Sequence, residues 1–116
     1  MDKPKISIED FKKIEIKIGE ILSAEKVPET DKLLRLTVNF GEEAPRQIVS
    51  GISLYFPEPQ ALVGKKCAFA TNLEPRTIKG LESNGMILAV SGGEAGSQYF
   101  SLLESSQSIP PGASAK

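Results

Sequence analysis

The segment IEIKIGEILSAEKV, residues 14–27, decides the fold class. Its first three isoleucines alternate with charged residues, which is the period of a strand with one buried face. The alternation slips at Gly19 and resumes at Ile21, and a strand that changes phase at a glycine indicates a β-bulge. We therefore expect one long strand that bends at Gly19 and serves two sides of a small β-barrel.

The rest of the chain predicts further strands. KLLRLTVNFG, residues 32–41, points Leu34, Leu36, Val38 and Phe40 to one side. Strands are also expected in RQIVSGI (46–52), KKCAFATNL (65–73), GMILAV (85–90) and SQYFSLL (97–103). A short helix is expected in SIEDFKKI (7–14), with Ser7 as N-cap, and one or two helical turns in FPEPQALVG (56–64).

This order of elements predicts an all-β protein with the OB-fold, a five-stranded Greek-key barrel. A short N-terminal helix would precede the barrel and a C-terminal extension would follow it. A generic small β-barrel would show nearly the same pattern. At 116 residues we expect one domain over residues 8–116, preceded by a tail or linker over residues 1–7.

Composition excludes several classes of function. The chain has no histidine and a single cysteine, so it offers no zinc site and no disulfide framework. The lone Cys67 lies in an apolar run and is expected to be a buried thiol, which suits a reducing cytoplasm. No paired-acid pattern, P-loop or nucleophile elbow is present. We expect no catalytic residues, metal or cofactor, and a binding module rather than an enzyme.

The net charge of −1 is unevenly spread along the chain. Residues 1–31 carry six basic and eight acidic residues, whereas residues 32–83 carry seven basic and five acidic residues. The middle segment therefore has a net charge of +2. This distribution suits a limited phosphate-contacting patch, although an ordinary mixed surface would look similar.

OB-folds bind oligonucleotides on strands 2 and 3 and with the loops that join strands 1–2 and 4–5. The polar residues that the predicted strands bring to this face are Lys32, Arg35, Arg46, Gln47, Arg76, Lys79, Ser83 and Asn84. Arginine binds a phosphate through two hydrogen bonds and lysine acts as a point charge. The alternative is that these residues form a solvated barrel rim, with Gly80 and Gly85 shaping a hairpin. Met86 would then fill the barrel instead of bordering a ligand.

The aromatic residues favour folded RNA over single-stranded DNA. Binders of single strands stack bases on exposed aromatic rings. Here Phe11, Phe40 and Phe69 fall in phase with the core, and the remaining four aromatic residues lie outside the proposed face. Recognition by shape and backbone fits better.

Several motifs together carry a family resemblance. They are DFKKIEIKIGEILSAEKVPETDKLLRLTVNFG, RQIVSGI, LVGKK, NLEPRTIKGLESNGMIL and IPPGA. Together they resemble the tRNA-binding domain found at the C-terminus of many methionyl-tRNA synthetases, as a stand-alone tRNA-binding protein and in the EMAP-like cytokine precursors. The resemblance runs from about Ile8 to the end of the chain.

The resemblance implies an OB-fold that binds tRNA by its overall shape, with little dependence on the anticodon. In synthetases the module raises the affinity of the catalytic body for tRNA. The tRNA-contacting positions it implies are Lys32, Arg35, Arg46, Gln47, Asn72, Arg76, Lys79, Ser83 and Met86, with Asn84 beside them. It also implies a homodimer formed through a C-terminal extension, about residues 92–116, which holds Tyr99, Phe100, Leu102 and Leu103.

Two departures from the family pattern lower the expected affinity for tRNA. Thr77 stands where many relatives have another lysine or arginine, and GEEAPRQ brings two acids close to Arg46.

Two other functions remain open at this point. One is a homodimeric chaperone like the CsaA proteins, which resemble this fold and bind unfolded or exported polypeptides. The other is a dimerisation appendage with little RNA contact.

Overall fold

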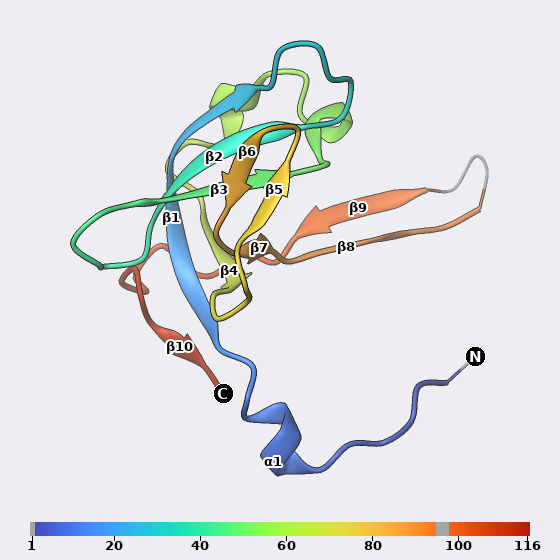
Figure 1. Ribbon diagram of the computed structural model, residues 1–116, viewed down its shortest axis with the longest axis vertical. Coiled ribbons are helices and arrows are strands. Elements are labelled where there is room, and N and C mark those ends of the chain that lie inside the picture. The colour runs from blue at the N-terminus through green and yellow to red at the C-terminus, as the bar shows by residue number, and fades with distance from the viewer. Residues whose placement is uncertain (1, 95–97) are drawn as a thin grey trace.

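The computed structural model describes residues 2–94 and 98–116 and shows a small β-barrel with a projecting two-stranded arm (Figure 1). Residues 2–7, before α1, follow an extended path away from the barrel. The elements are α1 (Ile8–Phe11), β1 (Ile16–Lys26), β2 (Leu34–Asn39), β3 (Arg46–Ser50), the 3₁₀ turns η1 (Ser53–Tyr55) and η2 (Pro59–Leu62), β4 (Lys66–Ala70), β5 (Arg76–Ile78), β6 (Leu81–Ser83), β7 (Met86–Ile87), β8 (Ala89–Gly92), β9 (Tyr99–Leu102) and β10 (Ser114–Ala115).

The main sheet has the strand order β3-β2-β1-β4-β7, with β10 paired to β1. The first half of β1 pairs with β4 and its second half with β2, so one strand serves two sides of the barrel as predicted. The segment around β6 and β7 returns to β3, where Asn84 donates its backbone N–H to the carbonyl of Gln47 at 2.9 Å. This contact brings the two ends of the sheet together. The predicted OB-like barrel is confirmed.

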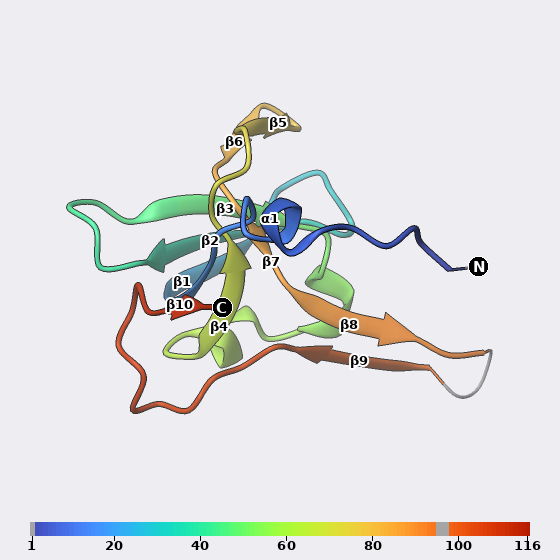
Figure 2. The same cartoon turned by 90° about the horizontal axis from the view of Figure 1, so that it is seen from below.

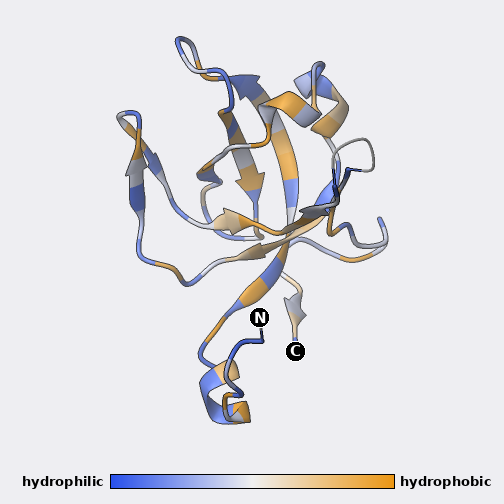
Figure 3. Cartoon of the chain, turned by 90° about the vertical axis from the view of Figure 1, so that its right-hand side faces the viewer, coloured by the Kyte–Doolittle hydropathy of each residue, from blue (hydrophilic) through white to orange (hydrophobic). Residues whose placement is uncertain are grey.

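The apolar side chains of the strands fill the barrel, and Figure 3 shows hydrophobic and hydrophilic residues alternating along them. All four predicted core residues of β2 and the turn after it are buried. Cys67 is a buried free thiol, as expected. The core consists of Ile21, Ala24, Leu34, Leu36, Val38, Phe40, Ile48, Ile52, Leu62, Cys67, Phe69, Ile87 and Leu102.

The bulge in β1 lies three residues beyond the predicted position. Ile21 pairs with Val38 and Ser23 with Thr37, so Leu22 is the extra residue. Gly19 pairs regularly with Cys67 and has a different role. A Cβ there would lie 2.5 Å from Cγ1 of Val38 and 2.6 Å from Cε1 of Phe40. The glycine is needed because two core side chains pack directly on its backbone.

The helical turn expected in FPEPQALVG is present as the 3₁₀ turn η2, but two other local predictions need correction. The predicted fifth strand is divided into β7 and β8. Phe11 is 47% exposed because α1 stands clear of the barrel, so its assignment to the core is wrong (Figure 3). Ser7 does cap α1, accepting a hydrogen bond from the Asp10 N–H at 3.1 Å.

The arm formed by β8 and β9 is attached to the barrel by aromatic side chains. Phe100 stacks on Tyr55 with ring centroids 3.9 Å apart and meets Phe56 edge-on at 5.8 Å. The chain beyond the arm returns along β4, where Leu103 accepts from the Ala68 N–H at 2.9 Å. Among the residues that the structure describes, no helix is long and apolar enough to cross a membrane.

Candidate nucleic-acid interface

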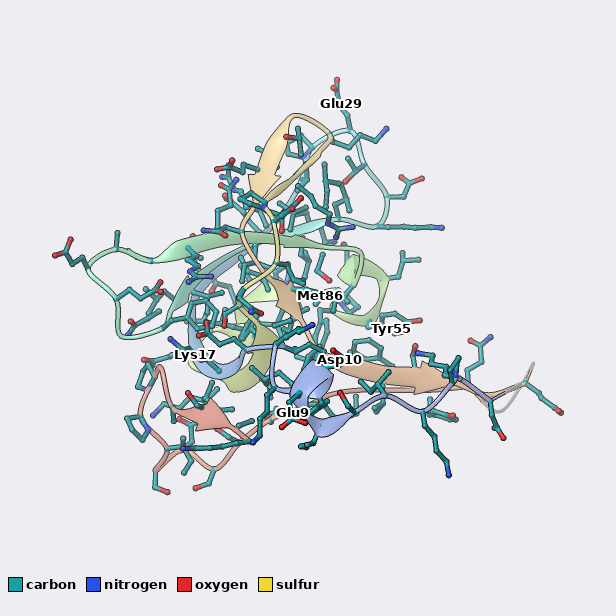
Figure 4. The ribbon with its side chains drawn as sticks, turned by 60° about the horizontal axis from the view of Figure 1, so that its bottom comes forward. Glu9, Asp10, Lys17, Glu29, Tyr55 and Met86 are labelled. Carbon is teal, nitrogen blue, oxygen red and sulfur yellow. The ribbon has the colours of Figure 1, made fainter. Side chains whose placement is uncertain are left out.

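Two segments far apart in the sequence meet at one end of the barrel. One is the loop between β1 and β2, and the other is the hairpin made by β5 and β6. Figure 4 shows Glu29 of the loop beside the tip of the hairpin. Two clefts separate them, and Lys79 at the hairpin tip lines both. The long loop predicted between the fourth and fifth strands is therefore an ordered hairpin that stands next to the first loop.

Lys79 occupies a strained position in the hairpin turn. Its φ is +51° and that of Gly80 is +79°, which is the pattern of a two-residue type I′ turn. Asparagine or glycine usually fills the first position, because a left-handed backbone costs other residues about 1 kcal/mol. The exposed side chain forms no ion pair with another described residue. A lysine here raises the energy of the turn and presents a free cation at its tip.

Arg35 lies on β2 directly opposite Glu25 of β1, and its guanidinium forms an ion pair with that carboxylate. Lys26, at the end of β1, lines the same cleft and has no ion pair among the described residues. Glu25 and Lys26 were not predicted as site residues. The position of Lys26 at the boundary between the strand and the VPETD loop was the available signal.

The exposed Lys32 lines the second cleft with Glu29, Asp31 and Lys79. Arg76 is exposed on β5, across from Ser83. Neither Lys32 nor Arg76 is paired to an acid in the described part of the chain. Both predicted cations are therefore accessible from solvent.

Met86 is 43% exposed and lies in β7, opposite Ala70 (Figure 4). It sits at the base of the hairpin rather than at the tip. Asn84 is half-buried at the same base, where its backbone closes the barrel against Gln47. These two positions border the exposed cations without lying among them.

Ser83 does not belong to the exposed surface. It is 2% exposed, and its Oγ accepts from the Val49 N–H at 2.9 Å and lies 3.2 Å from the Gly85 carbonyl. The hydroxyl is used inside the barrel, which does not favour the predicted contact of Ser83 with RNA. Gln47 has a related role, since its Nε2 donates to the Glu82 carbonyl at 2.9 Å. Both residues fix the hairpin to β3.

Arg46 is also used within the fold. Its Nε and Nη2 donate to the two carboxylate oxygens of Glu42 at 2.9 and 2.7 Å, and Nη1 donates to the Thr71 carbonyl at 2.7 Å. The guanidinium lies 5.3 Å from the ring centroid of Phe40. The hydrogen bonds from Arg46 lower the pKa of Glu42, and those bonds likewise raise the pKa of Arg46. An arginine held this way is not free to bind a phosphate, so its predicted role is corrected to a structural one.

Asn72 ties the N-terminal segment to the barrel. Its Oδ1 accepts from the Glu15 N–H at 2.8 Å and its Nδ2 donates to the Lys13 carbonyl at 2.6 Å. Asn72, which was predicted to contact RNA, therefore has a structural role near α1. The structure thus brings together Lys32, Arg35, Arg76 and Lys79, and assigns Arg46, Gln47, Asn72 and Ser83 to the framework.

The residues predicted at a dimer interface are partly exposed and partly buried. Tyr99 is 61% exposed, Leu103 is exposed, and Phe100 is partly covered by Tyr55 and Phe56. Leu102 is 6% exposed and belongs to the core, so it is excluded from an interface. A second set of exposed apolar residues, Ile8, Phe11 and Ile14, lines a groove of about 360 Å³ between α1 and β10.

The comparison with protein families agrees with this geometry. Residues 16–114 match the model of the family described as "Putative tRNA binding domain". The chain belongs to this tRNA-binding domain family. The matched residues include β1 to β9, so the match covers every element that carries the exposed cations.

Similar proteins place the tRNA-binding domain among synthetase relatives. It is 51% identical over 109 residues to a methionine–tRNA ligase of Methanospirillum hungatei, which covers 94% of this chain and 15% of that protein. A MetRS-related protein from Pyrococcus horikoshii has a similar structure, with a TM-score of 0.86, 37% identity and coverage of 98% of this chain and 100% of that chain. The chaperone CsaA from Bacillus anthracis gives a TM-score of 0.78 at 25% identity, with 97% and 100% covered.

The chain spans about 15% of the length of the first curated relatives that it matches.

Proposed function

We propose that this domain binds tRNA by shape and backbone, through a surface at the end of the barrel that we call the hairpin face. It is made of Lys32, Arg35, Arg76 and Lys79, and Lys26 borders it. The observation that carries the proposal is that Arg76 and Lys79 are exposed and free of ion pairs among the described residues, on a hairpin fixed to the barrel. Cations held on a rigid element meet phosphates at low entropic cost.

The placement of the aromatic residues supports folded RNA as the ligand. Phe40 and Phe69 pack in the core. Phe100 attaches the arm to the barrel by packing on Tyr55 and Phe56. No described aromatic residue lines either cleft beside the hairpin. Without a stacking platform, a sequence-tolerant binder of single strands has little to hold its bases. Contacts to the backbone of a folded RNA need only the cations.

The relatives support a proposal about the wider context of the domain. We propose that it is an accessory module with no catalytic chemistry of its own, which raises the affinity of a methionine–tRNA ligase for tRNA or acts as a stand-alone protein in translation. Residues 1–7, which contain no helix or strand among the described positions, would serve as a tail or linker. The buried, free Cys67 suits the cytoplasm, where translation takes place.

We also propose that the domain forms a homodimer through its terminal segments. The groove between α1 and β10 and the side chains of Tyr99 and Leu103 expose apolar surface that a second copy would cover. A CsaA-like chaperone is the second candidate function. The same groove favours it, because an apolar groove also suits an extended polypeptide.

Fluorescence anisotropy with three labelled ligands tests the function. The ligands are total tRNA, a single-stranded DNA of equal length and an unfolded polypeptide. We expect binding to tRNA alone, and at least a tenfold loss in the double variant Arg76→Glu, Lys79→Glu, because two attractive contacts of about 0.5–1 kcal/mol each become repulsive.

A matched control changes the net charge equally elsewhere. The variant Lys3→Glu, Lys5→Glu reverses two charges in the N-terminal tail and is expected to bind tRNA almost like the native domain. Equal losses in both variants would show that only total charge matters. Binding of the polypeptide without binding of tRNA would favour the chaperone function.

A further inference from the structure

The two clefts beside the hairpin differ in charge. The cleft lined by Glu25, Lys26, Val27, Pro28, Arg35, Lys79 and Leu81, which we call the nucleotide cleft, holds three cations and one acid. The neighbouring cleft contains Lys32 and Lys79 against Glu29 and Asp31, so its charges balance. A phosphate placed near the hairpin is therefore attracted to the nucleotide cleft more strongly than to its neighbour.

In the nucleotide cleft, the carboxylate of Glu25 already binds Arg35 in the way that a phosphate could. Arg35 is paired with the carboxylate of Glu25, and their side chains are 41% and 56% exposed. A carboxylate and a phosphate present similar oxygen pairs to a guanidinium. Glu25 therefore occupies the position on Arg35 that an incoming phosphate would take, and exposure of the pair leaves room for the exchange.

The floor of the nucleotide cleft is apolar. Two of its lining residues are aliphatic: Val27, which is buried, and Leu81 of the hairpin, which is half-buried. The cleft has a volume of about 320 Å³, at the small end of the range for small-molecule sites. An anion site alone would need no aliphatic floor. A ligand with one phosphate and one flat apolar face matches both parts of the cleft.

We propose that the nucleotide cleft binds one unpaired nucleotide of the RNA. Its phosphate displaces Glu25 from Arg35 and is also contacted by Lys79, while its base lies on Val27 and Leu81. A paired nucleotide has its base stacked within a helix and cannot enter the cleft. This inference deepens the proposed function and rests on it, because it names the part of the RNA that the hairpin face holds most specifically.

An NMR titration with small ligands tests the cleft without tRNA. Adenosine 5′-monophosphate is compared with adenosine and with inorganic phosphate, on the native domain and on three variants. We expect the monophosphate to shift the amides of Val27 and Leu81, and to bind at least fivefold more tightly than either fragment. Glu25→Gln should tighten its binding about threefold to fivefold because the competing carboxylate is gone, and Arg35→Gln should weaken it at least fivefold. Lys5→Gln, in the exposed N-terminal tail, should change it less than twofold.

A pair of RNA hairpins then tests the requirement for an unpaired nucleotide. One ends bluntly and the other carries four unpaired nucleotides at its 3′ end. We expect the second to bind at least fivefold more tightly, with the difference lost in Arg35→Gln. Equal affinity for the two hairpins, or equal shifts from phosphate and from the monophosphate, would overturn the inference.

The two proposals fail in distinguishable ways. Native binding to tRNA with no preference between the RNA hairpins would leave the proposed function standing and would overturn the nucleotide cleft. Tight binding of the monophosphate with no binding of tRNA would support the cleft and overturn the proposed function.

Discussion

Replacement of Ser83 by alanine separates a structural role from an RNA-contacting one. Val49 lies in β3 at the edge of the sheet, and its N–H finds its acceptor in the Ser83 Oγ at 2.9 Å. Val49 is 3% exposed and Ser83 2% exposed, so water does not replace the lost hydroxyl. A buried donor left without a partner costs about 1–3 kcal/mol. We expect Ser83→Ala to lower the free energy of unfolding by about 2 kcal/mol.

Urea unfolding and thermal unfolding measure this change. For a domain of this size, 1 kcal/mol corresponds to roughly 4 °C in Tm, so the expected decrease is about 8 °C. Ser101→Ala is the matched control. Its Oγ donates to the carbonyl of the next residue on the exposed arm, and its loss should change stability by less than about 0.5 kcal/mol.

The affinity for tRNA provides the second measurement. At a temperature where Ser83→Ala is still folded, we expect its Kd to stay within about threefold of the native value, or ~0.7 kcal/mol. A variant with unchanged Tm and a large loss of tRNA affinity would refute the assignment of Ser83 to the framework. It would restore the residue to the RNA-binding surface.

Three further perturbations test other parts of the structure. Gly19→Ala should destabilise the domain by about 1–3 kcal/mol in urea unfolding, because its Cβ would lie 2.5 Å from Val38. Gly51→Ala is the control and should be nearly neutral, because a Cβ there would meet nothing within 4 Å. Equal effects of the two substitutions would contradict the packing argument. Lys79→Asn should raise the free energy of unfolding by about 0.5–1 kcal/mol, because asparagine suits the type I′ turn. The same substitution should lower the affinity for tRNA, and an unchanged affinity would remove Lys79 from the hairpin face. Burial raises the pKa of the Cys67 thiol from 9.0 to about 11, so unfolding exposes a more acidic thiol. Stability should therefore fall between about pH 9 and 11, by up to ~2.7 kcal/mol relative to Cys67→Ala, and parallel pH profiles of the two proteins would refute this.

The architecture of the barrel could be predicted because it depends on local periodicity. The alternation in β2 predicted Leu34, Leu36 and Val38 as core residues, and all three are buried. The phase change in β1 also predicted correctly that one strand serves two sides of the barrel. Its position was wrong, because Gly19 is required by packing of Val38 and Phe40, a contact between strands that one segment alone cannot indicate.

The candidate site was less predictable because side-chain partners come from distant segments. Nothing near Asn72 in the sequence indicates that it binds the backbone of Lys13 and Glu15. The two acids of GEEAPRQ did raise the expectation of a neighbour for Arg46, and Glu42 is that neighbour. The exposed cations of the hairpin were predictable because no such partner captures Arg76 or Lys79 among the described residues.

The salt dependence of tRNA binding tests the hairpin face most directly. Four phosphate contacts from Lys32, Arg35, Arg76 and Lys79 predict a slope of about −3 for log affinity against log salt concentration, at roughly −0.7 per contact. The neutral variant Arg76→Gln, Lys79→Asn should bind with a slope of about −1.4. A flat response of the native domain, or an unchanged slope in the variant, would contradict the claim that these cations hold the RNA.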